Sequence, residues 1–147
     1  MDTENNKLKI LFLCTGNSCR SQMAEGWTRE LKSNVIEPYS AGIEAYGLNP
    51  NAQKVMKEVG IDISGQESKH VDTFKDLSFD YVVTVCGHAH EQCPVFSGGA
   101  KVIHVGFDDP PALAANAKTE EEGLKMYRGV RDEIRDFVKI LPHALRA

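Results

Sequence analysis

The sequence predicts an α/β protein in which a four-stranded parallel sheet is flanked by helices. Short β-branched and apolar runs alternate along the chain with longer segments in which apolar residues recur at helical spacing. Such alternation is typical of parallel sheets, because parallel strands need a crossover connection that is usually a helix. The chain has 147 residues, of which 41% are hydrophobic, and this suits one compact domain spanning residues 1–147.

The first strand and the first helix lie close together near the start of the chain. Residues 7–13 form a continuous apolar run, as expected of a buried parallel strand, which delivers Cys14 to the carboxyl end of that strand. Residues 21–32 switch to helical periodicity, and Ser21 is placed to cap the helix. The apolar face of this helix consists of Met23, Ala24, Trp27 and Leu31.

A second strand and a second helix follow. Residues 35–41 predict a short strand. A helix is expected at 49–59, where Pro50 suits the first turn and Gly60 ends the helix. Residues 62–76 have mixed periodicity, so we expect a loop that contains at most one short helix.

The second half of the chain predicts two more strands and a long helix. Residues 80–85 are rich in β-branched residues and predict a strand that delivers Cys86 to its end. Residues 101–105 predict a fourth strand, and the Asp-Asp-Pro-Pro segment at 108–111 breaks the chain directly after it. A long helix is expected at 119–141. Its apolar side carries Leu124, Tyr127, Val130, Ile134, Val138 and Leu141.

Three chemically active side chains follow the carboxyl ends of these strands. Cys14 follows the first strand, Cys86 the third and Asp109 the fourth. In a right-handed parallel α/β sheet the ends of such strands meet in one crevice, which is where these proteins bind ligands. We therefore expect the three side chains to converge in one site.

The charge pattern excludes several kinds of partner. The formal net charge is -4, the pI is near 5.7, and lysine and arginine occur in clusters no longer than a pair. A nucleic acid or an anionic membrane surface is therefore not expected as a partner. Residues 1–6 are polar and acidic, and the apolar run at 8–13 is too short for a signal core or a membrane span, so we expect a cytosolic protein.

Residues 14–20, Cys-Thr-Gly-Asn-Ser-Cys-Arg, have the spacing of a loop that binds a tetrahedral oxyanion. The backbone can curl so that successive N–H groups point at one anion, and Gly16 and Asn17 tolerate the left-handed conformations that such a curl needs. The helix that starts near Ser21 directs its positive end to the same point, and Arg20 adds a planar fork of donors. The residues expected to bind the oxyanion are Thr15, Gly16, Asn17, Ser18, Cys19, Arg20 and Ser21.

Cys14 is the predicted nucleophile. An unperturbed thiol has a pKa of about 8.5, and the loop is expected to depress the pKa of Cys14 so that the thiol ionises at neutral pH. The alternative is an ordinary strand-to-helix turn with an inert, buried cysteine. Asp109 is the expected general acid, but Asp108 beside it leaves the assignment open on chemistry alone, and both residues also suit a plain turn before proline.

Cys86 and Cys93 form a second pair of thiols. Static disulfides are rare in a reducing cytosol, and positions seven apart in a helix lie about two turns apart, too far for a disulfide unless the segment rearranges. The pair therefore favours a transient disulfide that forms and reopens during turnover. Two alternatives remain: a zinc site with His88 and His90, although the segment lacks a Cys-x-x-Cys knuckle, or two structural cysteines beside solvated histidines.

Three thiols in relay indicate a reductase. Cys14 attacks an oxyanion whose central atom accepts two electrons, and Cys86 then attacks the sulfur of the adduct, which releases reduced product and leaves a Cys14–Cys86 disulfide. Cys93 attacks Cys86 next, which regenerates Cys14 and leaves a Cys86–Cys93 disulfide for an external dithiol. Phosphate cannot undergo this reduction, whereas arsenate can, so arsenate is the expected substrate.

Motifs spread over most of the chain carry a family resemblance. They are CTGNSCRSQMAEGW at 14–27, YSAGI at 39–43, GLNP at 47–50, MKEVGIDIS at 56–64, CGHAHEQC at 86–93, GFDDP at 106–110 and VRDEI at 130–134. Through them the chain resembles the arsenate reductases of the thioredoxin-coupled class, which share the fold of the low-molecular-weight protein tyrosine phosphatases. The resemblance implies that fold, no bound cofactor, and reduced thioredoxin as the source of electrons. We expect the protein to act as a monomer.

The resemblance also implies roles for individual residues. Arg20 and Ser21 are implied as partners of the oxyanion and of the nucleophilic thiolate. The general acid is implied to be Asp109, which directly precedes Pro110, and Cys19 stays outside the catalytic set because related phosphatases also carry a cysteine there. The implied catalytic residues are Cys14, Arg20, Cys86, Cys93 and Asp109.

Some members of this class bind potassium beside the loop. They use residues matching Asn17, Glu25 and Ser40 together with an aspartate, but Lys69 stands where that aspartate would be. The ammonium of Lys69 is expected to pair with Glu25 and to replace the ion. No metal site is therefore expected.

The main rival function is a tyrosine phosphatase, which needs the loop and its acid but neither Cys86 nor Cys93. Such phosphatases present tyrosines just after the Asp-Pro pair, whereas Pro111 and Ala112 follow it here. Weak phosphatase side activity is still expected, because the loop cannot readily distinguish two tetrahedral anions of similar size. A non-enzymatic zinc or arsenite sensor that uses the cysteines as ligands is a second rival.

Overall fold

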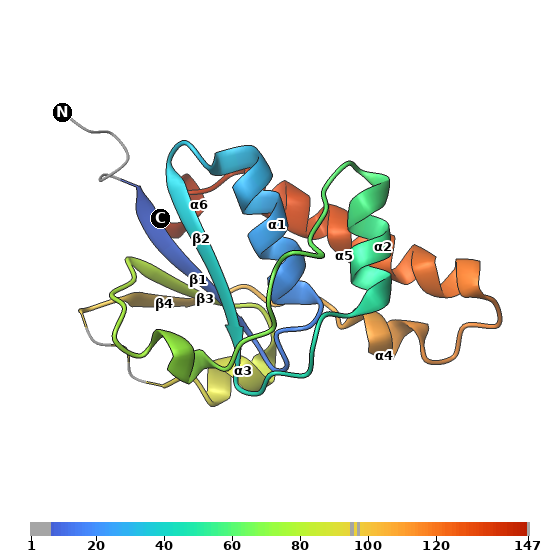
Figure 1. Cartoon of the computed structure of the whole chain (residues 1–147), viewed down its shortest axis with the longest axis horizontal. Helices are drawn as coiled ribbons and strands as arrows, with labels where there is room; N and C mark the ends of the chain where they lie inside the picture. Colours follow the sequence, from blue (N-terminus) through green and yellow to red (C-terminus); the bar gives the residue numbers. More distant parts are fainter. Residues whose placement is uncertain (1–6, 95, 97, 147) are drawn as a thin grey trace.

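The strands form one parallel sheet, which confirms the predicted fold class (Figure 1). The computed structural model describes residues 7–94, 96 and 98–146, so the polar segment at 1–6 lies outside the described residues. The sheet has four strands in the order β2-β1-β3-β4: β1 (Leu8–Cys14), β2 (Ile36–Gly42), β3 (Tyr81–Thr84) and β4 (Lys101–His104). The helices are α1 (Arg20–Lys32), α2 (Pro50–Glu58), the 3₁₀ helix η2 (Val71–Phe74), α3 (Gly87–Glu91), α4 (Pro110–Ala114), α5 (Glu120–Lys139) and α6 (His143–Arg146).

Strand β1 lies at the centre of the fold. It is hydrogen-bonded on one side to β2 and on the other to β3, in parallel register. Its residues Ile10, Leu11, Phe12 and Leu13 have no solvent exposure. Burial on both faces is what a continuous apolar run predicts, and the strand ends at Cys14 as expected.

Helices α1, α2, α4 and α5 gather on one side of the sheet, and α3 lies where the strands end (Figure 1). Helix α1 packs on β1 and β2 and against α5, while α2 and α4 pack against α5. The other face carries an aromatic cluster whose edge-to-face rings have centroids 5.3 to 6.1 Å apart. Its members are Tyr39, Phe74, Phe79 and Phe96.

Helix α5 is the longest element, and its start agrees with the predicted one. The Thr119 hydroxyl accepts a hydrogen bond from the Glu122 N–H at 3.1 Å, and three glutamates in the first turn suit the positive end of the helix. The predicted apolar side is confirmed. Its buried members are Leu124, Tyr127, Val130, Ile134, Val138 and, just beyond the helix, Leu141.

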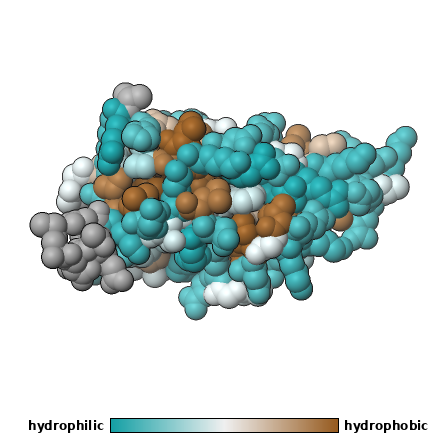
Figure 2. Space-filling model, turned by 90° about the horizontal axis from the view of Figure 1, so that it is seen from above, coloured by the Kyte–Doolittle hydropathy of each residue, from teal (hydrophilic) through white to brown (hydrophobic). Residues whose placement is uncertain are grey.

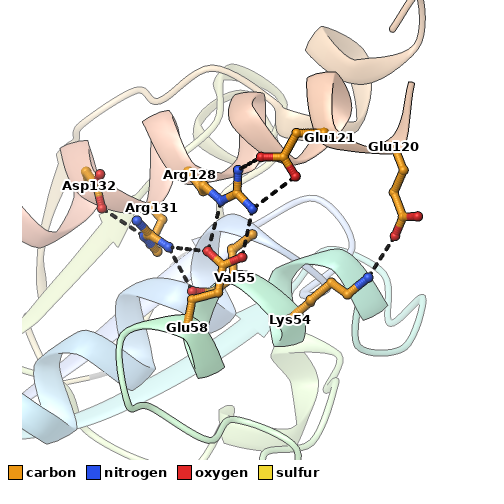
Figure 3. Close-up of polar contacts among 8 residues, drawn as sticks. All are labelled: Lys54, Val55, Glu58, Glu120, Glu121, Arg128, Arg131 and Asp132. Carbon is orange, nitrogen blue, oxygen red and sulfur yellow. Dashed lines mark hydrogen bonds and ion pairs between the residues drawn. The ribbon is translucent and has the colours of Figure 1, made fainter. Parts of the chain in front are cut away.

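An ion-pair network joins α2 to α5 (Figure 3). Glu58 accepts from Arg128 at 2.9 Å and from Arg131 at 3.0 Å, and Arg128 also pairs with Glu121. The guanidinium of Arg131 is buried and donates to the Val55 carbonyl at 2.9 Å, near the end of α2. The network therefore holds α2, and with it the loop that precedes α2, against the long helix.

Two predicted details are wrong. Helix α1 begins at Arg20, with Cys19 at the N-cap position and no side-chain cap; the Ser21 hydroxyl is buried and accepts from Asn17 Nδ2 at 2.9 Å instead of capping. The Asp-Asp-Pro-Pro segment does not break the chain but starts α4, because a proline at the first helical position loses no needed hydrogen bond. The short helices α3 and α6 were also not predicted.

The surface is mostly hydrophilic, with hydrophobic patches between the polar residues on the face seen in Figure 2. Within the described part of the chain, no helix combines the length and the apolar character needed to cross a membrane. Among the same residues the most exposed large apolar side chain is Tyr46, at 69%, and it lies beside the candidate site.

Candidate active site

The loop between β1 and α1 is held by a neighbouring segment of backbone. The Ile43 N–H donates to the Cys14 carbonyl at 3.1 Å, and the Tyr46 N–H donates to the Gly16 carbonyl at 2.9 Å. Further bonds link Glu44 N–H to Thr15 and Asn49 N–H to Ser18. Since the loop carbonyls are turned toward residues 43–49, the loop N–H groups are left to face the opposite side, as an oxyanion cradle requires.

Asn17 locks the turn of this loop. It has φ 48°, so the predicted left-handed conformation is confirmed at this residue, and its side chain is fully buried. Its Oδ1 accepts from the Lys69 N–H at 2.7 Å and its Nδ2 donates to Ser21 Oγ. Gly16 is needed for a different reason: a Cβ there would lie 2.3 Å from the Tyr46 ring.

Arg20 reaches from the first turn of α1 toward Asp109. Its Nη2 lies 3.6 Å from Asp109 Oδ1, and its Nη1 donates to the Phe107 carbonyl at 2.9 Å. Its Nε is buried and has no hydrogen-bond partner among the described residues, so one charged donor remains for an anion in the loop. Asp109 directly precedes α4 and is half-exposed, so water can exchange protons with it.

Cys14 and Cys86 lie near enough for each to shift the pKa of the other, although β1 and β3 bring them from distant parts of the sequence. Thr15 Oγ1 lies 3.0 Å from Cys86 Sγ, and the Ala89 N–H donates to the same sulfur at 3.4 Å. The structure thus brings together Cys14, Cys86 and Asp109, which confirms the expected convergence.

The pKa values of Cys14 and Cys86 are shifted in opposite directions. The hydrogen bond to Cys86 and burial raise the pKa of Cys14 well above its ordinary value. Hydrogen bonds from Cys14 and Thr15, together with the Ala89 N–H and the nearby Arg20 charge, lower the pKa of Cys86 to about 5. The expectation of a depressed pKa at Cys14 is therefore wrong for this arrangement, because Cys86 collects the donors and Cys14 keeps the proton that both sulfurs share.

Cys93 lies on the far side of α3 from Cys86. Cys86 is the N-cap residue of this helix, and Cys93 follows its last turn with its thiol near the Pro94 carbonyl at 3.6 Å. All four cysteines are thiols, and burial raises the pKa of Cys93. The pair is thus separated by an intact helix, as the transient-disulfide hypothesis requires.

Cys19 has properties that suit its place outside the catalytic set. It is 4% exposed, and burial and the Asp109 charge raise its pKa to about 12. A thiol that stays protonated is a poor nucleophile.

Glu25 does not pair with Lys69, which corrects the predicted substitute for a cation. The buried Glu25 carboxylate pairs with Arg29, one helical turn away, and accepts from Ser40 Oγ at 2.5 Å. Lys69 Nζ donates instead to the Glu67 carbonyl at 2.7 Å and lies 5.9 Å from the centre of the Phe74 ring. The sequence carries the signal for the correct partner, since Glu25 and Arg29 are four apart on one helix.

A cavity of about 280 Å³ opens above the loop. Cys14, Arg20 and Asp109 line its floor and one side, while Tyr46 and Pro111 form part of the wall. Tyr46 was not predicted, because nothing in the local sequence distinguishes it from an exposed loop residue.

The chain was compared with known proteins. A family model described as low molecular weight phosphotyrosine protein phosphatase matches residues 9–147. An arsenate reductase of Bacillus subtilis is 54% identical over 134 residues, covering 91% of this chain and 94% of that protein. An arsenate reductase of Halalkalibacterium halodurans is 52% identical with the same coverage. A solved structure of an arsenate reductase in its oxidized state has a TM-score of 0.76 and 31% identity, and covers 93% of this chain and 98% of that one.

Proposed function

The chain belongs to the low molecular weight phosphotyrosine protein phosphatase family, and we propose that within it the protein is an arsenate reductase that converts arsenate to arsenite. The observation that carries this proposal is the position of a second thiol beside the oxyanion loop: Cys86 Sγ lies 3.0 Å from the hydroxyl of Thr15, the residue that follows Cys14. A phosphatase needs one thiol there, whereas a reductase needs a second thiol within reach of the first. Relatives more than half identical over most of the chain bear the name arsenate reductase.

The first step is attack of Cys14 on arsenate. The loop N–H groups and the Arg20 guanidinium bind the oxyanion, and the thiolate of Cys14 forms as its proton passes to Cys86. Cys14 Sγ then bonds to arsenic while one oxygen leaves as water, with Asp109 as the proton donor.

The second step is the reduction. Cys86 loses its proton again and attacks Cys14 Sγ, so that an S–S bond forms and the S–As bond breaks. The electron pair of the S–As bond stays on arsenic, which leaves as arsenite. The Thr15 hydroxyl, 3.0 Å from Cys86 Sγ, favours the attacking thiolate.

The third step moves the oxidising equivalent to the surface. Cys93 attacks Cys86 Sγ, which releases Cys14 as a thiolate and leaves a Cys86–Cys93 disulfide. Cys93 is more exposed than Cys14 or Cys86, so it is the sulfur that an external dithiol reaches. We propose reduced thioredoxin as that dithiol, acting in a reducing cytosol on a monomeric enzyme with no bound cofactor.

The test is arsenate-dependent NADPH oxidation coupled through thioredoxin and thioredoxin reductase. We expect Cys86→Ser and Cys93→Ser to lose multiple turnover, whereas the control Lys54→Ala, at an exposed position on α2, keeps it. Full turnover by either of the first two variants would defeat the relay. Replacing thioredoxin by glutathione and glutaredoxin tests the donor separately from the relay.

A second, weaker activity is favoured by the position of Tyr46. Its exposed ring packs on Gly16 at the wall of the cavity, where it can contact an aromatic group attached to a phosphate in the loop. We propose slow hydrolysis of aryl phosphates, which needs Cys14 but not Cys93. Cys93→Ser is expected to retain p-nitrophenyl phosphate hydrolysis and Cys14→Ser to lose it; equal loss in both would exclude the phosphatase step.

A further inference from the structure

Two histidines lie close to one buried hydroxyl, next to the segment 86–93 that carries Cys86 and Cys93. Thr84 Oγ1 lies 2.9 Å from His104 Nδ1 and 3.3 Å from His90 Nδ1, and Thr84 has no solvent exposure. The two imidazole rings lie face to face, with centroids 4.7 Å apart and an angle of 35° between their planes. We call Thr84, His90 and His104 the histidine clasp.

The clasp joins three elements of structure. Thr84 and His104 are partners in the β3–β4 register, so their side chains lie on the same face of the sheet. His90 comes from α3, the helix that lies at the carboxyl end of the sheet (Figure 1). The clasp is therefore a polar side-chain contact between α3 and the strands β3 and β4, beside the apolar contact that the buried Ala89 makes with the core.

The Thr84 hydroxyl can form hydrogen bonds to both histidine rings at once. The Thr84 hydroxyl has one proton, so it donates to one ring nitrogen and accepts from the other when the two histidines are neutral and of opposite tautomer. Thr84 is buried while both histidines are exposed, so loss of one ring costs the free energy of that hydrogen bond, less whatever bond water then makes to the hydroxyl. Moving His90 away from Thr84 is therefore unfavourable in itself.

The relay requires that movement. Cys86 and Cys93 flank α3, and seven residues of helix span about 10 Å, whereas the Cα atoms of a disulfide lie within about 7 Å of each other. The helix must therefore open before the two sulfurs can bond. Since His90 belongs to the last turn of this helix, opening it removes His90 from the clasp.

We propose that the histidine clasp is a positioning device that stabilises the dithiol form of the Cys86–Cys93 pair against its disulfide. The clasp forms in the reduced enzyme and is broken in the oxidised one, so it makes the disulfide easier for an external dithiol to reduce. The inference rests on the proposed relay, because it gives the clasp a role only if that disulfide forms. None of the three side chains lines the cavity above the oxyanion loop, so they act through the conformation of α3.

The experiment measures the redox equilibrium of the Cys86–Cys93 pair in buffers of reduced and oxidised glutathione, with full-length protein in a Cys14→Ser, Cys19→Ser background. Thr84→Val removes the hydroxyl and keeps the shape of the side chain. We expect the equilibrium constant for disulfide formation to rise about threefold to tenfold, which corresponds to a potential more negative by about 15 to 30 mV. Thr84→Ser restores the hydroxyl and is expected to stay within about twofold of the parent.

A second pair of variants covers the case in which Thr84→Val does not fold. His90→Phe keeps an aromatic ring but loses Nδ1, and is expected to shift the equilibrium in the same direction as Thr84→Val. His88→Phe is the matched control, since His88 is exposed, lies in the same helix and makes no side-chain hydrogen bond among the described residues. His88→Phe is expected to leave the equilibrium unchanged.

The outcomes separate the clasp from the relay, because no arsenate is used. If the disulfide forms with the same equilibrium constant in Thr84→Val, His90→Phe and the parent, the clasp has no role while the relay stands. If the disulfide is weakened instead, the proposed direction is wrong. If no Cys86–Cys93 disulfide forms even in the parent, both the relay and the clasp are overturned.

Discussion

Replacing Thr15 with valine tests the inference that Cys86, rather than Cys14, is the ionised thiol of the resting site. The Thr15 hydroxyl lies 3.0 Å from Cys86 Sγ and stabilises its thiolate, next to the larger contribution of the Cys14 thiol. Valine has nearly the same shape but cannot donate a hydrogen bond. We therefore expect Thr15→Val to raise the pKa of Cys86 without disturbing the backbone of the loop.

The size of the shift follows from the strength of a charged hydrogen bond. Such a bond contributes about 1.5 to 3 kcal/mol, and a pKa change of one unit corresponds to about 1.4 kcal/mol, so we expect the pKa of Cys86 to rise by about one to two units. Starting from a pKa of about 5, the thiolate fraction at about pH 6 falls from about 90% to between about 50% and 10%.

The assay is a titration of thiolate ultraviolet absorbance between about pH 4 and pH 8. Only Cys86 is expected to ionise in this range, because the pKa values of Cys14, Cys19 and Cys93 are all raised. Thr15→Ser, which keeps the hydroxyl, is the control and should retain the wild-type midpoint. A wild-type midpoint near that of an ordinary thiol, or an unchanged midpoint in Thr15→Val, would refute the assignment of the charge to Cys86.

Three further predictions concern stability and ion dependence. Gly129→Ala should raise the free energy of unfolding in urea by about 0.5 to 1 kcal/mol, because the position is inside α5 and a Cβ there meets no atom within 4 Å; a decrease would contradict this. Arg131→Ala should lower the free energy of unfolding by about 2 kcal/mol, because the substitution removes a buried guanidinium and leaves its hydrogen-bond acceptors unpaired. The control Lys54→Ala, at an exposed position, should leave the urea midpoint unchanged. Potassium should raise neither activity nor melting temperature above a sodium control, because Arg29 already neutralises the buried Glu25 carboxylate; a marked rise with potassium would show that the ion still binds.

The elements that the sequence predicted correctly are those with a strong local pattern. The run at 10–13 is apolar on both faces because β1 lies between two strands and is covered on both sides, and the periodicity of α5 reflects one buried side. The helix α4 was missed because proline has two meanings, and only the tertiary context decides whether it ends one segment or begins a helix.

In the candidate site, too, local sequence patterns are predictive and contacts between remote segments are not. The positions of Cys14, Cys86 and Asp109 directly after strand ends are enough to predict that they meet, because parallel strands carry their carboxyl ends to one edge. The predicted partner of Glu25, Lys69, is wrong, because Arg29 lies one helical turn from Glu25 and pairs with it within the same helix.

The parallel sheet, the oxyanion loop and the set of reactive side chains can be predicted from the amino-acid sequence, since these depend on periodicity and on short spacings along the chain. Which of the sulfurs of Cys14 and Cys86 is ionised, and which side chains hold α3 against the sheet, follow only from the tertiary structure. Thr15 and Cys86 are 71 residues apart, and the histidine clasp joins β3, α3 and β4. A pKa and a buried hydrogen bond depend on desolvation and on distances of a few ångströms between segments remote in sequence, and no local pattern encodes those distances.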